Sequence, residues 1–140
     1  MRDADVDDIP YLLPMAKEFV TKAYSRINVP YDEESCKALL HRLIGEENGI
    51  LLTNADRTAM FGCFVHPWHF NQNYLTATEM FMWGEGALKL KDRGEEMAFE
   101  LGAGSMNLGN QEHMRSAALG RVYRMSGYVP SENIFIKELP

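Results

Sequence analysis

The stretch Ser116–Leu139 reads SAALGRVYRMSGYVPSENIFIKEL and decides which fold the chain is expected to adopt. Its first half has helical periodicity, and Gly127 is a residue type that commonly ends helices. A helix over Gln111–Ser126 is therefore predicted, with Tyr123 near its end. Asn133–Leu139 alternates between apolar and polar residues, which predicts a final strand. The inward face of the helix is expected to comprise Met114, Ala117, Ala118, Val122 and Met125.

Hydrophobic periodicity predicts the elements upstream of this stretch. Their order is two helices, three antiparallel strands, a helix, a strand, a helix and a strand. Such an order indicates an α/β or α+β domain in which helices cover one mixed sheet. No repeat or linker divides the chain, so a single domain over residues 1–140 is expected. The helices are predicted at 8–24, 32–46, 86–101 and 111–126, and the strands at 50–53, 60–65, 74–83, 105–108 and 133–139, with a marginal strand at 1–3.

Composition excludes several classes of protein. The formal net charge of −6 argues against broad phosphate neutralisation, and hence against a nucleic-acid binder. No apolar run approaches the roughly 18 residues that span a membrane. The opening residues MRDADVDDIP lack the apolar centre of a signal peptide, so a cytoplasmic location without membrane contact is expected.

The order of helix, Tyr123, Gly127–Tyr128 pair and strand resembles the C-terminal end of the GNAT family of acyl-CoA-dependent N-acetyltransferases. The opening RDADVDDIPYLLPMA is also similar to the first strand and helix of that family, where an Arg-x-Ala-x-x-x-Asp pattern recurs. The resemblance covers nearly the whole chain. It implies the GNAT fold, acetyl-CoA as co-substrate without a metal, and direct transfer of the acetyl group to a primary amine of a small molecule or peptide. It also leaves a homodimer open.

In the family, the helical tyrosine stands beside the coenzyme sulfur, which implies that Tyr123 is the general acid. A phenol with a pKa of about 10 can donate a proton to a thiolate at neutral pH. The alternative is a core tyrosine whose hydroxyl is satisfied locally. Ser116 stands where the family usually carries an Asn whose side chain contacts the pantetheine arm of the coenzyme. Asn107 or Asn110 is the candidate to make that contact in its place.

Glu79 is the candidate general base. It lies on the strand before a glycine pair, where family members often place a carboxylate. Burial among apolar neighbours would raise its pKa toward neutrality, which suits proton abstraction from an amine. The alternative is a carboxylate that faces solvent on a half-exposed strand.

The junction Gly84-Glu85-Gly86-Ala87 is the candidate pyrophosphate site, because backbone N–H groups at a helix N-terminus bind anions. Its alternative is a flexible turn before a basic face, where Lys89, Lys91 and Arg93 follow. The residues expected at the coenzyme are Phe81, Met82, Trp83, Gly84, Glu85, Gly86, Ala87 and Ser116.

This junction departs from the family pattern. Phe81 occupies the place of an Arg or Gln, and Trp83 directly precedes Gly84, which leaves the loop short. Either coenzyme binding has been lost, or a mobile loop is missing from the sequence; the second explanation is favoured. The competing hypothesis for the whole protein is a non-catalytic GNAT-like binding or structural module with a degenerate pyrophosphate loop.

Two further patterns have alternative interpretations. Cys63, His66 and His69 are spaced by three residues, but strand alternation separates them and no fourth ligand is evident, so a metal site is disfavoured. Residues 66–73 are polar and aromatic. They predict a loop that either lines the substrate entrance or attaches to the core through its aromatic rings.

Overall fold

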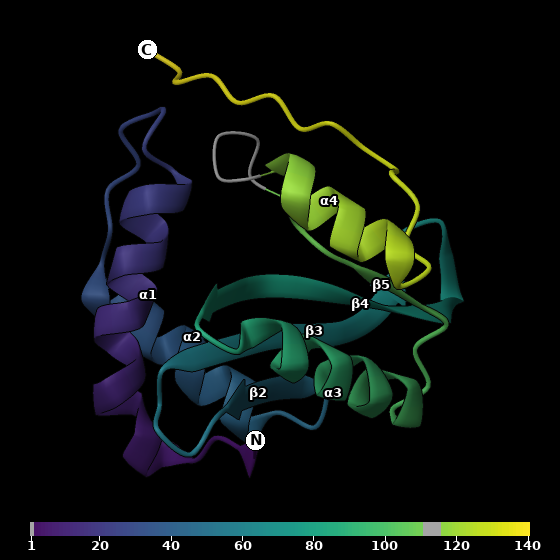
Figure 1. Cartoon of the computed structure of the whole chain (residues 1–140), viewed down its shortest axis with the longest axis horizontal. Coiled ribbons are helices and arrows are strands. Elements are labelled where there is room, and N and C mark those ends of the chain that lie inside the picture. Colours follow the sequence, from purple (N-terminus) through teal and green to yellow (C-terminus); the bar gives the residue numbers. More distant parts are fainter. Residues whose placement is uncertain (1, 111–115) are drawn as a thin grey trace.

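The computed structural model describes residues 2–110 and 116–140 and shows a sheet with helices on both faces (Figure 1). The predicted helix start at Gln111 and the inward position of Met114 lie outside the described residues. The elements are β1 (Arg2–Asp3), the 3-10 helix η1 (Val6–Asp8), α1 (Ile9–Ala23), α2 (Glu33–Gly45), β2 (Gly49–Thr53), β3 (Ala59–Trp68), β4 (Asn71–Gly84), α3 (Ala87–Glu100), β5 (Ser105–Asn107) and α4 (Ser116–Met125).

The sheet is mixed, as the sequence predicts. Its five strands lie in the order β1-β2-β3-β4-β5. The first four pair antiparallel, and β5 pairs parallel with β4 after the α3 crossover. The fold class is therefore α/β with one sheet, and the marginal first strand is real because it pairs with β2.

Residues 66–73 do not form the predicted loop. Strand β3 continues to Trp68 and β4 begins at Asn71, so the two strands form one long hairpin. Aromatic rings cover its end: the Trp68 ring lies 5.2 Å from Phe70 and 6.5 Å from Tyr74, both edge-on. These contacts stabilise pairing in a stretch whose composition resembles a loop.

Each face of the sheet has its own apolar core. On one face, α1 and α2 cover β2 and β3 through Leu12, Leu40, Leu43, Leu51 and Met60, among others. On the other face, α3 covers the same strands through Leu90 and Ala98. Gly94 allows α3 to approach β3 closely, because a Cβ at this position would overlap the Phe61 ring.

The N-terminus is held by a buried carboxylate. Asp8 is fully buried and accepts two hydrogen bonds from the Arg2 guanidinium, each 2.7 Å long. Arg57, on the β2–β3 turn, donates through Nε to the same carboxylate at 2.7 Å. These donors, with the Asp5 N–H at 2.9 Å, hold the pKa of Asp8 well below its usual range. Arg2 and Asp8 of the Arg-x-Ala-x-x-x-Asp pattern thus connect β1 with the start of α1, and Arg57 connects the β2–β3 turn to the same carboxylate.

The C-terminal part differs most from expectation. Helix α4 ends as predicted: Gly127 has φ +90° and the Tyr128 N–H bonds the Tyr123 carbonyl, which is a common helix stop. Residues 133–139, however, form no strand, since no neighbouring strand pairs with them in the described structure. The predicted inward face of α4 is also wrong, because the described positions Ala117, Ala118, Val122 and Met125 are exposed.

Among the described residues, no helix is both long and apolar enough to cross a membrane.

Candidate active site

The central feature of the site is a parting of two parallel strands. Pairing between β4 and β5 covers only Thr76–Thr78 and Ser105–Asn107. Strand β4 then continues through Glu79–Gly84 without a described strand on that side. The register with β3 shifts at the same point, because Gly62 faces Phe81 while Cys63 faces Glu79. The bulge therefore places an extra residue, Met80, in β4 where the strands separate, and bends β4 there.

Glu79 lies on the face of the sheet that α3 covers, because its partner Cys63 belongs to the core on that face. Its Oε1 accepts a 2.9 Å hydrogen bond from the Gly109 N–H. Its Oε2 is buried and has no hydrogen-bond partner among the described residues. Burial raises the pKa of Glu79 to about 7, although the hydrogen bond from Gly109 acts in the opposite direction. The carboxyl is therefore poised to exchange a proton near neutral pH.

Tyr123 is the buried residue of α4 in the described part of this helix. Its hydroxyl donates to the Gly109 carbonyl at 3.1 Å. Burial and, secondarily, the charge of Glu79 raise the pKa of Tyr123, so the phenol stays protonated at any ordinary pH. Glu79 therefore binds the N–H of Gly109 and Tyr123 binds its carbonyl, although the two side chains lie on elements far apart in sequence.

Sequence reasoning missed Gly109, which brings the two candidates together. A Cβ at this position would lie 3.0 Å from Glu79 Oε1, so the close approach favours glycine. The available signal was the Asn107-Leu108-Gly109-Asn110 stretch directly after a predicted strand, since glycine there marks a turn or a close approach. The Asn110 side chain donates to the Ser116 carbonyl at 2.9 Å, and Asn107 donates to Thr76.

The connection from β4 to α3 consists of Glu85 and Gly86 only. Gly84 is still paired with Ala59 at the end of β4, so the connection is as short as the sequence indicates. Gly86 has φ +94° and stands at the helix N-cap without a side-chain cap, which leaves the first N–H groups of α3 available. A shallow groove of about 390 Å³ lies at this junction and is lined by Met82, Trp83, Gly84, Gly86, Ala87, Leu88 and Lys89.

The other residues proposed for the coenzyme differ in position. The Phe81 side chain is buried in the core under α1 and α2, so only its backbone could reach a ligand. Lys91 is buried: its Nζ lies 2.7 Å from Asp92 and 5.4 Å from the Tyr128 ring centre. Lys91 therefore points away from any phosphate. Arg93 pairs with Glu96 at 3.1 Å. Lys89 remains as the basic residue beside the groove.

Tyr128 fixes the end of α4 against α3. Its hydroxyl donates to Glu95 at 2.7 Å, and its ring centre lies 5.8 Å from that of Tyr123. Burial, with the neighbouring Glu95, raises the pKa of Tyr128. The Gly127–Tyr128 pair thus positions the Tyr123 side chain, and it does so without leading into a strand.

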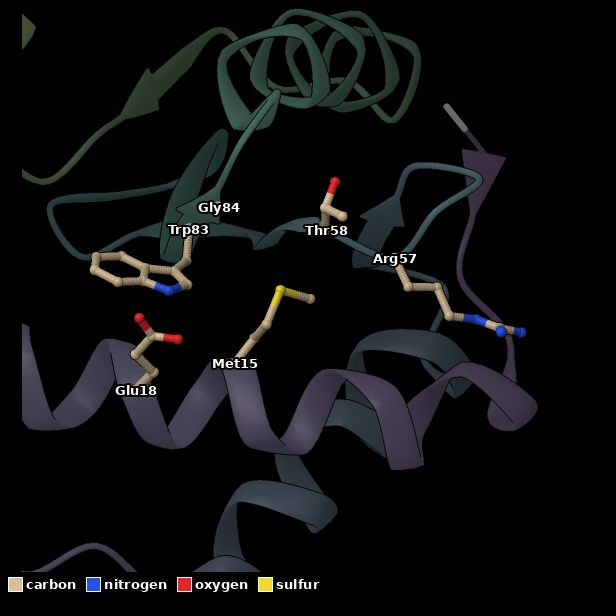
Figure 2. Close-up of a pocket in the computed structure, with 6 residues that line it drawn as sticks. All are labelled: Met15, Glu18, Arg57, Thr58, Trp83 and Gly84. Carbon is tan, nitrogen blue, oxygen red and sulfur yellow. The ribbon is translucent and has the colours of Figure 1, made fainter.

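A second groove, of about 440 Å³, lies between α1 and the end of β4 and is lined by Met15, Glu18, Arg57, Thr58, Trp83 and Gly84. Figure 2 shows Glu18 and the Trp83 ring close together, while the Arg57 guanidinium points away toward the far end. Lys22 lies between Glu18 and Trp83: its Nζ is 3.1 Å from Glu18 Oε1 and 5.6 Å from the Trp83 ring centre. A cation is therefore held between a carboxylate and an aromatic face.

Comparison with known proteins rests on structure. No family model matches the chain, and no curated protein matches it in sequence. A transcriptional regulator from Bacillus halodurans C-125 superposes with a TM-score of 0.74 at 19% identity, covering 99% of this chain and 97% of that one. A predicted acetyltransferase from Clostridium acetobutylicum, solved with acetyl-CoA, gives 0.71 at 16% identity over 98% and 94%.

An aminoglycoside 6'-N-acetyltransferase from Acinetobacter haemolyticus gives a TM-score of 0.64 at 13% identity, covering 99% of this chain and 98% of that one. The chain has the GNAT fold. In this chain, the pairing of β4 with β5 ends at Thr78 and Asn107. At such low identities, the similarity establishes the arrangement of the GNAT elements, and the chemistry must be argued from the residues.

The geometry does not support the metal site considered for Cys63, His66 and His69. Within residues 2–110 and 116–140, no group of three or more His, Cys, Asp or Glu side chains is placed to hold an ion. Cys63 is buried, and burial raises the pKa of its thiol to about 12. His66 Nε2 lies 2.7 Å from the Thr78 hydroxyl, so this ring already has a partner.

Proposed function

We propose that this protein is an N-acetyltransferase that moves an acetyl group from acetyl-CoA to a primary amine by direct transfer. The observation that carries the proposal is the arrangement around Gly109. A buried carboxyl with a pKa near 7 and an unpartnered oxygen, Glu79, shares this residue with a buried phenol, Tyr123. Both lie where β4 and β5 part.

The coenzyme fits the site in part. The N–H groups at the start of α3 and the Lys89 ammonium supply positive charge for its phosphates. Beyond Glu79, the unpaired side of β4 offers backbone groups to an extended chain such as pantetheine. The short Glu85–Gly86 connection provides fewer amides than a full phosphate-binding loop, so we expect weak affinity for the coenzyme.

Proton transfer is assigned to two residues. Glu79 takes a proton from the acceptor ammonium, directly or through one water, and the neutral amine then attacks the thioester carbonyl. When the C–S bond of the tetrahedral adduct breaks, Tyr123 donates its proton to the departing sulfur, and the proton that the amide nitrogen releases restores the phenol through solvent. To reach the sulfur, the hydroxyl must leave the Gly109 carbonyl, a neutral hydrogen bond whose net contribution is only about 1 kcal/mol.

The groove between α1 and β4 is the candidate acceptor site. The Glu18 carboxylate and the Trp83 ring form surroundings that suit an ammonium group, and they now hold that of Lys22. The acceptor is therefore a small-molecule or peptide amine that carries positive charge, and the net charge of −6 also favours a cationic substrate. The aminoglycoside acetyltransferase with the same fold is named for a substrate of this chemical class.

The first test is binding. Acetyl-CoA at about fifty times its Kd contributes about 2 kcal/mol of stability, which raises the melting temperature of a chain of this size by roughly 5 °C. Dephosphorylated pantetheine at the same concentration is the control, because it lacks the anionic groups. Absence of a shift at millimolar acetyl-CoA would favour the non-catalytic module, for which the short connection and Phe81 are the supporting observations.

The second test is turnover on a panel of amines. Tyr123→Phe is expected to lower kcat by about a hundredfold or more without a comparable change in coenzyme affinity. Tyr11→Phe is the matched control, because it removes an exposed hydroxyl while the ring can stay over Arg57. Equal turnover of both variants and of the native protein would remove the acid role from Tyr123.

A further inference from the structure

Lys91 carries a buried charge that the proposed reaction does not use. Its side chain is only 2% exposed and lies on the face of α3 that also buries Ala87, Leu90 and Gly94. Lysine is rarely buried, because an ammonium group loses its hydration unless partners replace it. The Lys91 Nζ lies 2.7 Å from the exposed carboxylate of Asp92 and 5.4 Å from the centre of the Tyr128 ring. The buried charge therefore acts on the segment that follows α4.

Helix α3 holds both the ring and the hydroxyl of Tyr128. The ring faces the Lys91 ammonium, and the hydroxyl donates to Glu95 Oε2 at 2.7 Å. A contact between a cation and an aromatic ring is stronger when water is excluded from it, as it is at Lys91. Burial and, after it, the contact with Glu95 raise the pKa of Tyr128, so its hydroxyl remains a donor at ordinary pH. Lys91 and Glu95, one helical turn apart, thus form a socket for Tyr128.

Helix α4 depends on this socket because little of its own surface is buried. Tyr123 is its buried residue in the described part, whereas Val122 is 37% and Met125 88% exposed. Beyond the helix, residues 129–139 pair with no strand of the described sheet. A helix without a buried apolar face is not fixed by packing on the sheet. Its position is therefore set by the contacts of Tyr123 and Tyr128.

Tyr128 is coupled directly to Tyr123. Its N–H donates to the Tyr123 carbonyl at 3.0 Å, and the two ring centres are 5.8 Å apart. The Tyr123 hydroxyl in turn donates to the Gly109 carbonyl at 3.1 Å. A displacement of Tyr128 would therefore move the Tyr123 hydroxyl away from its place at Gly109. Displacing a reacting group by about 1 Å can lower a rate by about a hundredfold.

We propose that Lys91 is a positioning residue, which keeps Tyr123 in place for acetyl transfer by holding the Tyr128 ring. This role rests on the proposed function, because it requires Tyr123 to be the acid. Lys89 lines the groove at the start of α3, whereas Lys91 does not. Lys91 therefore affects the chemical step and leaves the binding of acetyl-CoA unchanged.

Steady-state kinetics of Lys91→Met test this separation. Methionine keeps much of the length of the side chain and removes its charge. We expect kcat to fall about tenfold while the KM for acetyl-CoA stays within about twofold. The acidic limb of the kcat profile should stay near pH 7, because Glu79 receives its hydrogen bond from Gly109 and not from α4. Lys37→Met, which removes an exposed lysine from α2, is the control and should match the native protein.

An unchanged kcat in Lys91→Met would overturn the proposal. So would a shift of the acidic limb, or a rise in KM as large as the loss in kcat, because either result indicates a general disturbance of the site.

A double-mutant cycle tests the route through Tyr128. Tyr128→Leu removes the ring that Lys91 contacts, so adding Lys91→Met to it should lower kcat no further. Tyr128→Phe keeps the ring and loses only the hydrogen bond to Glu95, so Lys91→Met should still lower kcat in that background. Losses from Lys91→Met and Tyr128→Leu that multiply in the double variant would refute the route.

Hydrogen exchange tests the attachment of α4 without any turnover. In Lys91→Met the amides of α4 should exchange about tenfold faster than in the native protein, while those of β3 keep their protection. Unchanged exchange in α4 would contradict the proposal, and so would equal acceleration in α4 and β3, which indicates general destabilisation. If the native protein transfers no acetyl group, the proposed function fails, but this measurement still decides whether Lys91 holds α4.

Discussion

Replacing Glu79 with Gln should change how the stability of the protein depends on pH. In the folded protein the pKa of this carboxyl is about 7, against an ordinary value of 4.5. As the pH rises above about 4.5, the carboxyl ionises in the unfolded chain but stays neutral in the folded one. The folded state therefore loses stability between about pH 4.5 and 7, by up to about 3 kcal/mol in total.

Glutamine has no proton to lose, so Glu79→Gln should remove this slope. Its Oε1 can still accept the Gly109 N–H, and any cost of the buried amide is the same at each pH. Urea unfolding followed by circular dichroism, at intervals from pH 4.5 to 7.5, measures the difference directly. We expect the variant to gain about 3 kcal/mol relative to the native protein across this range.

The matched control is Glu47→Gln, which removes an exposed carboxylate from the turn before β2. It should leave the native pH dependence in place. A difference between Glu79→Gln and the native protein that stays constant, within about 0.5 kcal/mol, from pH 4.5 to 7.5 would refute the burial argument. The role of Glu79 as a base would then lose its physical basis, whatever the activity data show.

Three other predictions concern the frame of the site. Asp8→Asn leaves two guanidinium groups without their carboxylate and should lower the free energy of unfolding by about 3 to 5 kcal/mol in urea titration at pH 7. Gly94→Ala should cost about 1 to 3 kcal/mol, because the added Cβ overlaps the Phe61 ring; unchanged stability would contradict the close packing of α3. Calorimetric titration with acetyl-CoA should show about tenfold weaker binding for Lys89→Met and no change for Lys91→Met, which is buried beside Tyr128; equal losses would contradict the assignment.

The sequence predicted the elements whose pattern is local. The helix at residues 86–101, the strand at 105–108 and the glycine stop at Gly127 agree with the structure to within a residue or two. Periodicity and capping determine such elements, because the contacts involved lie within a few residues. The same holds for Asp32, whose side chain accepts the Ser35 N–H and begins α2.

Features that depend on distant partners could not be predicted. The long β3–β4 hairpin depends on cross-strand aromatic contacts of Trp68, and residues 133–139 have strand character without a strand beside them. Lys91 appeared basic and exposed, but its helix face turns toward Tyr128. The roles of Tyr123 and Glu79 remain predictions, and their meeting at Gly109 required a contact between residues 30 positions apart.

The backbone of Gly109 has a consequence for how this site could evolve or be engineered. The Gly109 N–H donates to Glu79, the proposed base, and the Gly109 carbonyl accepts from Tyr123, the proposed acid. A displacement of this short segment would therefore shift both groups in concert, so neither can be tuned alone by changes nearby. Variation in the residues that follow β5 should therefore alter the acidic limb of a rate profile, which Glu79 sets, together with the turnover that depends on Tyr123.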